Sequence, residues 1–513
     1  MFNIIFKSSR SVTFELMNKE IYYSNSPFDV FLDGKSVLKN IKTNVFSIYD
    51  LMPNTEYELE VLGSKTTFKT DYESVSLNVL DFNAKGDGIS VDTMAIQTAI
   101  LTAPKDARVY IPKGTYLVGP IFLKSDITIE LDKEATLLYL TDRNQYPILP
   151  DRYQKHDGSF YEITSWEGVP AKQYASMITG INVENVKIIG LGIFDGNAQN
   201  SDWWTNHKIM RGAWRPNGLF LVHSKNVGLQ GVTVKNTPSW NLHPYFSDDL
   251  DFIDIKIESP KDSPNTDGCD PECCRNVNII GVDFSVGDDC IALKSGKYDI
   301  GRLYQQPCEN VVIRNCMMKY GHGAVVLGSE MSGGMKDIKV SQCYFLDTDR
   351  GLRIKTRRGR GKDAVIDGIE FENIYMKGVL TPLVMNMYYY CDDDGKTEYV
   401  WSKEVHPVDE RTPYLGSFKF KDMVCEDAHV AAGYFYGLPE QTIKSIELEN
   451  IKVSFADRPE SGIPAMMSFL EPMTNKGFYF NQVDEVIIKN VSIMGHIGDT
   501  FELHNVKKQS IKE

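Results

Sequence analysis

The sequence has no long apolar run and no excess of basic residues, and these absences exclude several classes of protein. No stretch of about 18 apolar residues occurs, so neither a membrane span nor a membrane partner is expected. Residues 1–7 are followed by two serines and an arginine, which leaves no apolar run of signal-peptide length. A cytoplasmic location is therefore expected, unless a signal sequence was trimmed. The net charge of −14 argues against nucleic acid as a partner.

Cysteine is present, but not in the pattern of a disulfide framework or a zinc site. The chain has nine cysteines, an odd number. Cys269, Cys273 and Cys274 lie close together, but no second Cys or His pair follows at zinc spacing. We therefore expect no bound metal and no cofactor.

Residues 1–72 are expected to form a small β-sandwich domain. Short alternating segments at residues 11–16 and 28–32 indicate strands, and Asp33-Gly34 indicates a turn. The segment Leu51-Met-Pro-Asn-Thr-Glu-Tyr57 resembles the tyrosine corner of fibronectin type III domains, in which a Tyr hydroxyl ties a loop back onto the sandwich.

Residues 73–513 follow a repeat that predicts a second, larger domain. A ten-residue pattern has apolar residues at its third, fifth, eighth and tenth positions, and copies begin at Glu184, Lys225, Asp248, Arg275, Glu309, Lys336, Asp367, Lys444 and Asp484. The period of two within each copy indicates strands, and one copy cannot bury its own apolar face. The pattern predicts an all-β solenoid, a parallel β-helix of about nine or ten coils stacked at the spacing of paired strands. A helix at residues 92–100 would cap its open end.

Four short segments fall in four consecutive coils and gather acid–base groups. They are Asn265-Thr-Asp267-Gly, Gly-Asp288-Asp289-Cys, Gly-His322-Gly and Arg353-Ile-Lys355. Equivalent positions on neighbouring coils lie about 4.8 Å apart, so these side chains should form one stripe. Stacked aspartates repel one another and push one pKa upward, which costs stability and serves acid–base chemistry.

Together these four segments resemble the signature of glycoside hydrolase family 28, the polygalacturonase family, over residues 75 to 500. The resemblance implies a right-handed parallel β-helix and hydrolysis with inversion. It implies that Asp288 is the general acid, that Asp267 and Asp289 activate water, and that His322 holds the acid in its working state. Inversion needs about 6.5–9.5 Å between acid and base, and carboxylates that lean apart on neighbouring coils could provide this gap.

Positive charge is concentrated near the fourth segment and favours an acidic sugar as substrate. Arg353 and Lys355 are expected to grip a substrate carboxylate. They belong to a basic cluster that also includes Arg350, Arg357, Arg358, Arg360 and Lys362, and Lys294 follows the Asp pair. Further candidate substrate contacts are Asn265, Glu330, Tyr388, Trp240 and His243.

The expected reaction is cleavage of α-1,4 bonds in polygalacturonate or oligogalacturonates. The alternatives are a rhamnogalacturonan or xylogalacturonan hydrolase, a β-helical pectate lyase and a non-enzymatic glycan-binding β-helix. Two additions could close one end of the cleft and make the enzyme act from chain ends. They are the amino-terminal domain and residues 142–173, which interrupt the repeat and are rich in aromatic residues.

Overall fold

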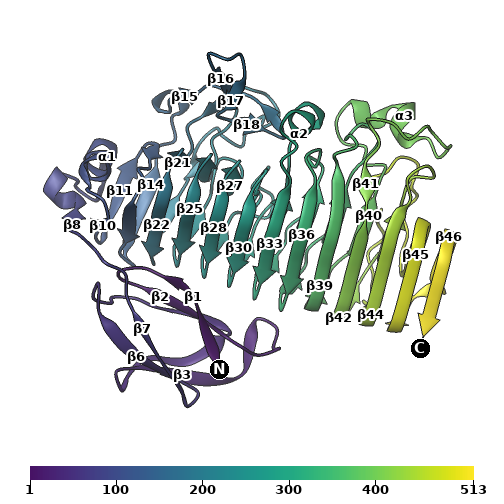
Figure 1. Ribbon diagram of the computed structural model, residues 1–513, viewed down its shortest axis with the longest axis horizontal. Helices are drawn as coiled ribbons and strands as arrows, with labels where there is room; N and C mark the ends of the chain where they lie inside the picture. Colours follow the sequence, from purple (N-terminus) through teal and green to yellow (C-terminus); the bar gives the residue numbers. More distant parts are fainter. Residues whose placement is uncertain (513) are drawn as a thin grey trace.

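The repeated apolar pattern builds a parallel β-helix in the computed structural model, which describes residues 1–512. Each coil adds a strand to a continuous ladder (Figure 1). Val227, Leu250 and Val277 occupy the same register in three successive coils. Because side chains alternate between the two faces of a strand, this register sends a row of apolar side chains inward.

The longest ladder runs along one side of the solenoid. Its strands are β8 (Ser76–Asn78), β10 (Ala107–Ile111), β13 (Ile127–Leu131), β22 (Glu184–Gly190), β25 (Lys225–Gln230), β28 (Asp248–Ile253), β30 (Arg275–Ile280), β33 (Cys308–Arg314), β36 (Met335–Ser341), β39 (Val365–Lys377), β42 (Ser417–Ala428), β44 (Ile443–Phe455), β45 (Lys476–Met494) and β46 (Ile497–Lys512). The expected number of coils was therefore too low. The sequence pattern missed β8, β10, β13, β42 and β46, which pair in the same ladder.

Two further rows of strands complete the coils. One holds β9 (Asp87–Val91), β11 (Gly114–Val118), β14 (Ala135–Tyr139), β23 (Ile193–Asp195), β26 (Thr233–Lys235), β29 (Lys256–Glu258), β31 (Asp283–Ser285), β34 (Met317–Lys319) and β37 (Tyr344–Leu346). The other, which we call the site face, holds β12 (Ile121–Phe122), β21 (Ile178–Ile181), β24 (Leu219–Val222), β27 (Leu242–Tyr245), β32 (Ile291–Leu293), β35 (Val325–Gly328), β38 (Arg350–Lys355), β40 (Thr381–Asn386) and β43 (Ala431–Tyr436). A short strand, β41 (Tyr414–Leu415), pairs with β39.

Asparagines shape the start of the ladder strands. Asn226, Asn276 and Asn310 have φ angles of 54°, 56° and 55°. Asparagine tolerates this left-handed conformation better than most residues. The side-chain amide of Asn310 donates to the side-chain oxygen of Asn276 at 2.6 Å, and Asn226 donates to Asn185 at 2.7 Å. The Asn-Val pairs of the sequence repeat therefore mark places where stacked coils are joined by side-chain hydrogen bonds.

One apolar core runs through the solenoid. Cys316 and Cys343 lie in it, buried and unbridged, as expected for small residues in the same slot of adjacent coils. The predicted cap is confirmed as helix α1 (Thr93–Thr102), whose Ile96, Ala99 and Ile100 are buried in the same core. The helix thereby covers apolar side chains that an open coil would leave in water.

Residues 2–69 form two antiparallel sheets. One consists of β1 (Phe2–Lys7), β2 (Val12–Leu16) and β5 (Val45–Ile48), and the other of β3 (Tyr23–Leu32), β4 (Lys35–Thr43), β6 (Glu56–Val61) and β7 (Ser64–Lys69). Phe14 of the first sheet and Val30 of the second belong to one buried cluster. The Tyr57 hydroxyl accepts a hydrogen bond from the Met52 N–H at 2.8 Å, which is the tie expected of a tyrosine corner. The fibronectin type III relationship stays a prediction.

The sandwich docks against the long ladder. Arg314 donates to both carboxylate oxygens of Glu15 at 2.6 and 2.7 Å, and Phe6 packs with Ile189 and Ile253. Figure 1 shows this domain on the side of the solenoid opposite helix α2 (Tyr298–Tyr304). The expectation that it closes the cleft is wrong, because its apolar and charged contacts are with strands of the long ladder.

The 142–173 insertion lies on the same side as α2 and the short helix α3 (Glu398–Trp401) (Figure 1). Three small hairpins build it. They pair β15 (Ile148–Leu149) with β20 (Gln173–Tyr174), β16 (Arg152–Gln154) with β17 (Phe160–Glu162), and β18 (Ser165–Trp166) with β19 (Val169–Pro170). We call the last of these the 165–170 hairpin. Of the two additions, only this insertion covers the site face.

None of the helices within residues 1–512 has the length and apolar character needed to span a membrane.

Candidate active site

A cavity of 540 Å³, which we call the cleft, opens on the site face. Its lining includes Glu167, Trp240, Asn265, Asp267, Asp288, Asp289, Lys294, His322, Glu330, Arg353, Lys355 and Tyr389. Each of the four segments singled out in the sequence contributes a side chain to it. The coil stacking therefore brings together groups that are far apart in the chain.

Three carboxylates meet at the centre of the cleft. Asp267 and Asp289 come from adjacent coils, which are joined there by a 2.9 Å hydrogen bond from the Gly268 N–H to the Asp289 carbonyl. One oxygen from each of Asp267, Asp288 and Asp289 lies within 4.8 Å of the others. The expected separation of about 6.5–9.5 Å is therefore not present. The rise between coils, about 4.8 Å, keeps these side chains close.

Glycines in the four segments allow this close stacking. A Cβ atom on Gly321 would lie 2.6 Å from the Asp288 carbonyl oxygen and 2.8 Å from the Cys290 sulfur. A Cβ atom on Gly268 would lie 2.3 Å from the Cys290 carbonyl oxygen. The glycines beside the catalytic candidates are thus required by coil-to-coil contact.

His322 and Asp288 form an ion pair that holds one proton. The His322 Nδ1 lies 3.2 Å from a carboxylate oxygen of Asp288. The hydrogen bond to Asp288 raises the pKa of His322 to about 9, against the opposing effect of burial. Burial alone would raise the pKa of Asp288, but the His322 hydrogen bond and charge lower it to about 2. At neutral pH the shared proton therefore resides on the imidazole.

Asp289 is surrounded by the two predicted cations. Lys355 Nζ donates to its carboxylate at 2.8 Å, and an Arg353 nitrogen lies 3.6 Å from the other oxygen. Arg353 also donates to the Met466 sulfur at 2.7 Å. Arg353 and Lys355 lie two residues apart on β38, so both side chains project from the same face of one coil toward the aspartates. In the free protein their charge is thus directed at Asp289.

Asp267 is almost fully buried, at 4% exposure. Burial raises its pKa strongly, and the nearby Asp270 and Asp288 raise it further, while Lys294 opposes them. Asp270, which the sequence reasoning missed, is fully buried, and burial raises its pKa to about 8. One indication of Asp270 was available in the repeat. Asp270, Ala292, Val326 and Arg353 occupy the same position on four successive coils, so Asp270 belongs to the row that also holds Arg353.

Lys294 and Glu330 form a second ion pair at the edge of the cleft. Their charged atoms lie 3.4 Å apart, and Lys294 also lies 3.3 Å from Asp270. Burial would raise the pKa of Glu330, but Lys294 and other cations lower it. The Lys294 ammonium lies 4.7 Å from the Trp240 ring centroid. Trp240 is only 3% exposed, so its ring offers little surface for a sugar to stack on.

Asn265 is held in place by an arginine that no sequence motif singled out. Arg215 donates to the Asn265 side-chain oxygen at 2.6 Å and to the carbonyls of Pro238 and Pro264 at 2.8 and 3.0 Å. Burial lowers the pKa of Arg215 to about 10. Arg215 therefore fixes the loop that leads into Asp267.

Two predicted substrate contacts are wrong. His243 is fully buried, and its ring nitrogens lie 2.9 Å from Asn217 and 3.0 Å from Glu272. Tyr388 is 1% exposed and packs in the core. The next residue, Tyr389, lines the cleft instead, because successive side chains in an extended segment point to opposite sides.

Most of the basic cluster serves the fold and does not reach the cleft. Arg358 donates to both carboxylate oxygens of Glu440 at 2.6 and 2.9 Å, and it is 1% exposed. Arg357 bonds to Asp392 and Asp394 at 3.0 and 2.8 Å. Arg353 and Lys355 are the members of the cluster that line the cleft.

Comparison with known proteins identifies the family. The model described as glycosyl hydrolases family 28 matches residues 102–406. The chain belongs to this family. The family 28 chain is 31% identical over 393 residues to a probable polygalacturonase of Vitis vinifera, covering 74% of each protein. It is 27% identical over 427 residues to an exo-poly-alpha-D-galacturonosidase of Dickeya chrysanthemi, covering 72% of this chain and 67% of the relative.

The fold is also that of a solved member of the family. The structure of a Yersinia enterocolitica family 28 exopolygalacturonase matches with a TM-score of 0.74 and 20% sequence identity, covering 99% of this chain and 98% of that one. At this identity the likeness concerns the fold. It confirms the parallel β-helix predicted from the repeat, and the family 28 assignment makes the chain a glycoside hydrolase.

The His322–Asp288 pair predicts how the activity of this glycosidase depends on pH. The pair holds its proton below the His322 pKa of about 9 and loses it as the pH rises through that value. We expect kcat/KM to fall with an alkaline limb near pH 9, since kcat/KM reports ionisations of the free enzyme. In His322→Gln that limb should disappear or shift. A wild-type alkaline limb that the substitution leaves in place would contradict the assignment.

Proposed function

We propose that this family 28 hydrolase cleaves the α-1,4 bonds between galacturonic acid residues of polygalacturonate or its oligomers, acting from chain ends. The observation that carries the proposal is the juxtaposition of three carboxylates, one imidazole and two cations in one cleft. Relatives named polygalacturonase and exo-poly-alpha-D-galacturonosidase support the choice of reaction.

The proton on the Asp288–His322 pair suits the step in which the glycosidic bond breaks. Asp288 delivers this proton to the glycosidic oxygen as the C1–O bond breaks, and His322 supplies it to Asp288. A water molecule then bonds to C1 and gives up its own proton to a carboxylate. The proton lost by the pair and the proton released by water balance over one turnover.

Asp289 is the better candidate for activating the water. The family resemblance implies this role equally for Asp267 and Asp289, but burial favours the protonated form of Asp267 in the free protein. Asp289 is ion-paired with Lys355 at 2.8 Å. We therefore assign water activation to Asp289 and orientation of the water to Asp267.

Inversion at C1 is proposed from the family resemblance, because the close carboxylates do not by themselves select it. Short separations of about 5–5.5 Å are usual for retaining enzymes. Proton NMR of the first product distinguishes the two: an α-linked substrate gives a β-anomer by inversion and an α-anomer by retention.

The 165–170 hairpin supports action from a chain end. The Trp166 ring stacks on Trp214 at 4.6 Å and on Trp240 at 6.0 Å, nearly parallel to both. The Ser165 hydroxyl donates to Glu272 at 2.9 Å, and the Lys297 N–H donates to the Gly168 carbonyl at 2.9 Å. The hairpin thus crosses the site face where a long chain would otherwise continue past β27. The cleft volume lies in the range of ordinary small-molecule sites, about 300–1,000 Å³.

The product pattern tests this proposal directly. With polygalacturonate as substrate, we expect reducing ends to accumulate while viscosity falls slowly, and early products to be mono- or digalacturonate. Trimming one end leaves most of the polymer length intact, whereas internal cuts halve it. Viscometry, reducing-end assays and chromatography of the first products provide the measurement. A rapid loss of viscosity with a ladder of medium oligomers would contradict end-wise action and leave the hydrolase proposal standing.

A further inference from the structure

A second cavity, of 690 Å³, lies beside the cleft and has no part in the reaction described above. Gly168 and Val169 line it, while the preceding Glu167 lines the cleft. Asp392 lines both cavities. The tip of the 165–170 hairpin therefore stands between two neighbouring cavities. The hairpin tip packs closely against Glu330, because a Cβ atom on Gly168 would lie only 2.6 Å from a side-chain carbon of that residue.

The second cavity is rich in charge of both signs. Its cations are Arg152, Lys297, Arg357, Arg360 and Arg411, and its carboxylates are Asp299, Asp392 and Asp394. The five cations exceed the three carboxylates by two charges. A neutral sugar would leave the cations unmatched, and a polyphosphate would be repelled by the aspartates. A carboxylated sugar suits both, because its carboxylate accepts from arginine while its hydroxyls donate to aspartate.

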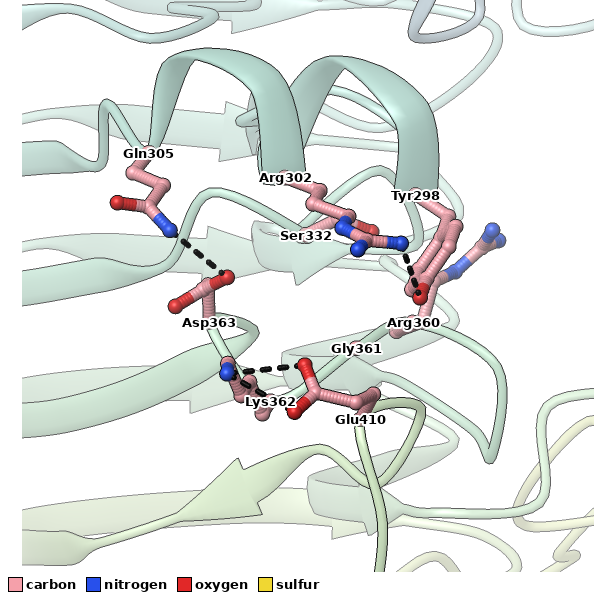
Figure 2. Close-up of a pocket in the computed structure, with 9 residues that line it drawn as sticks. All are labelled: Tyr298, Arg302, Gln305, Ser332, Arg360, Gly361, Lys362, Asp363 and Glu410. Carbon is pink, nitrogen blue, oxygen red and sulfur yellow. Dashed lines mark hydrogen bonds and ion pairs between the residues drawn. The ribbon is translucent and has the colours of Figure 1, made fainter.

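Arg360 is the strongest indication that an anion binds here. It is 3% exposed, and its Nε and Nη2 atoms have no hydrogen-bond partner within residues 1–512. The nearest carboxylate, Asp392, lies 3.6 Å away. Figure 2 shows Arg360 extending past the Tyr298 ring, away from the Lys362–Glu410 ion pair. Burying a guanidinium whose nitrogens lack hydrogen bonds is costly, and nearby Arg357 avoids that cost with bonds to Asp392 and Asp394.

An aromatic face lies beside this guanidinium. Tyr298, the first residue of α2, lines the second cavity, and the Arg411 guanidinium carbon lies 5.0 Å from its ring centroid. Arg411 is exposed, so it can move toward a ligand at little cost. The ring supplies an apolar surface and the arginines supply donors, which together match a charged pyranose ring.

We propose that the second cavity binds a galacturonate residue, with its carboxylate on Arg360. The choice of sugar rests on the proposed function, whereas the preference for a carboxylated ligand rests on the cavity alone. Two sources of this uronate are consistent with the site. One is the free monosaccharide released by the reaction, and the other is a distant residue of an oligogalacturonide whose end occupies the cleft.

Calorimetric titration of the inactive Asp288→Asn protein tests the proposal without turnover. The ligands are D-galacturonate, D-galactose and tetragalacturonate. If the site takes the free product, D-galacturonate should bind in the second cavity. If it takes a distant sugar of the substrate, tetragalacturonate should bind more tightly because one of its residues contacts the second cavity. D-galactose should not bind there in either case. Adding Arg360→Gln should weaken that binding at least tenfold. Adding Lys362→Gln, which removes an exposed cation two residues away, should leave it unchanged.

The outcomes of these titrations distinguish the two sources of the uronate, and they distinguish failure of this inference from failure of the proposed function. Loss of D-galacturonate binding in the Arg360→Gln protein supports a site for the free product. Loss confined to tetragalacturonate supports a distant subsite. Unchanged binding of both overturns the inference. If Arg360→Gln fails to fold, Arg411→Gln, at an exposed position, gives the same decision. Failure of the wild-type protein to release uronate from polygalacturonate would instead count against the proposed function, whatever the titrations show.

Discussion

Replacing Asp288 by asparagine is expected to lower kcat on oligogalacturonates by about 10²–10⁴-fold, the usual contribution of a general acid. The amide has the same shape but cannot donate the proton that the Asp288–His322 pair holds. Asp262→Asn is the matched control, because Asp262 is an exposed carboxylate that lines the same cleft. Retention of more than about a tenth of the activity by Asp288→Asn would refute the assignment.

A second substrate makes this test specific for the acid. Asp267, whose pKa burial raises, is the alternative proton donor within the site. An aryl galacturonide with a nitrophenol leaving group needs little protonation, so it should restore activity to whichever variant lacks the acid. We expect this rescue in Asp288→Asn and not in Asp267→Asn. Rescue of Asp267→Asn and not of Asp288→Asn would instead identify Asp267 as the general acid.

Replacing Lys355 by methionine is expected to lower kcat/KM by about 30- to 4,000-fold. The estimate follows from the cost of removing one partner of a buried charge pair, about 2–5 kcal/mol, at about 1.4 kcal/mol per tenfold change. Lys355 lies 2.8 Å from Asp289, and both side chains are largely buried. Loss of the cation also removes a partner for the substrate carboxylate.

The division of the effect between kcat and KM shows what Lys355 does. A role in substrate binding alone would raise KM and leave kcat unchanged, whereas a role in holding Asp289 would lower kcat. We expect both changes. Lys319→Met is the control, because Lys319 lies 3.1 Å from Asp283 in a half-exposed pair that does not line the cleft. A kcat/KM for Lys355→Met within threefold of the wild-type value would make the pair structural.

Much of the active site was predictable because a solenoid translates spacing along the chain into spacing in space. Once Asp267, Asp289, His322 and Lys355 are placed on four consecutive coils, the parallel register leaves them little freedom. Strand alternation likewise separates inward from outward residues. The prediction that Tyr388 faces the cleft was wrong because Tyr388 lies in an irregular segment just after β40. In such a segment a shift of one residue moves a side chain from the cleft side to the core side.

The loops were not predictable, because their paths are decided by contacts between distant segments. Nothing local to Arg215 indicates that it would bond to Asn265, fifty positions along the chain. Arg358 similarly looked like part of a basic patch until Glu440, more than eighty positions away, turned out to be its partner. Such pairs form only when the solenoid has brought their loops to the same face.

The sequence by itself determined the parallel β-helix, the stripe of aspartates with His322, Arg353 and Lys355, and the membership of family 28. These follow from a repeated local pattern that every coil obeys. Only the tertiary structure decided that the sandwich lies away from the cleft, that Glu167 of the 165–170 hairpin lines the cleft, and that Arg360 is buried beside a second cavity with two nitrogens that lack hydrogen bonds within residues 1–512. These features depend on how irregular segments pack against the solenoid, and packing between distant segments leaves no periodic trace in the chain.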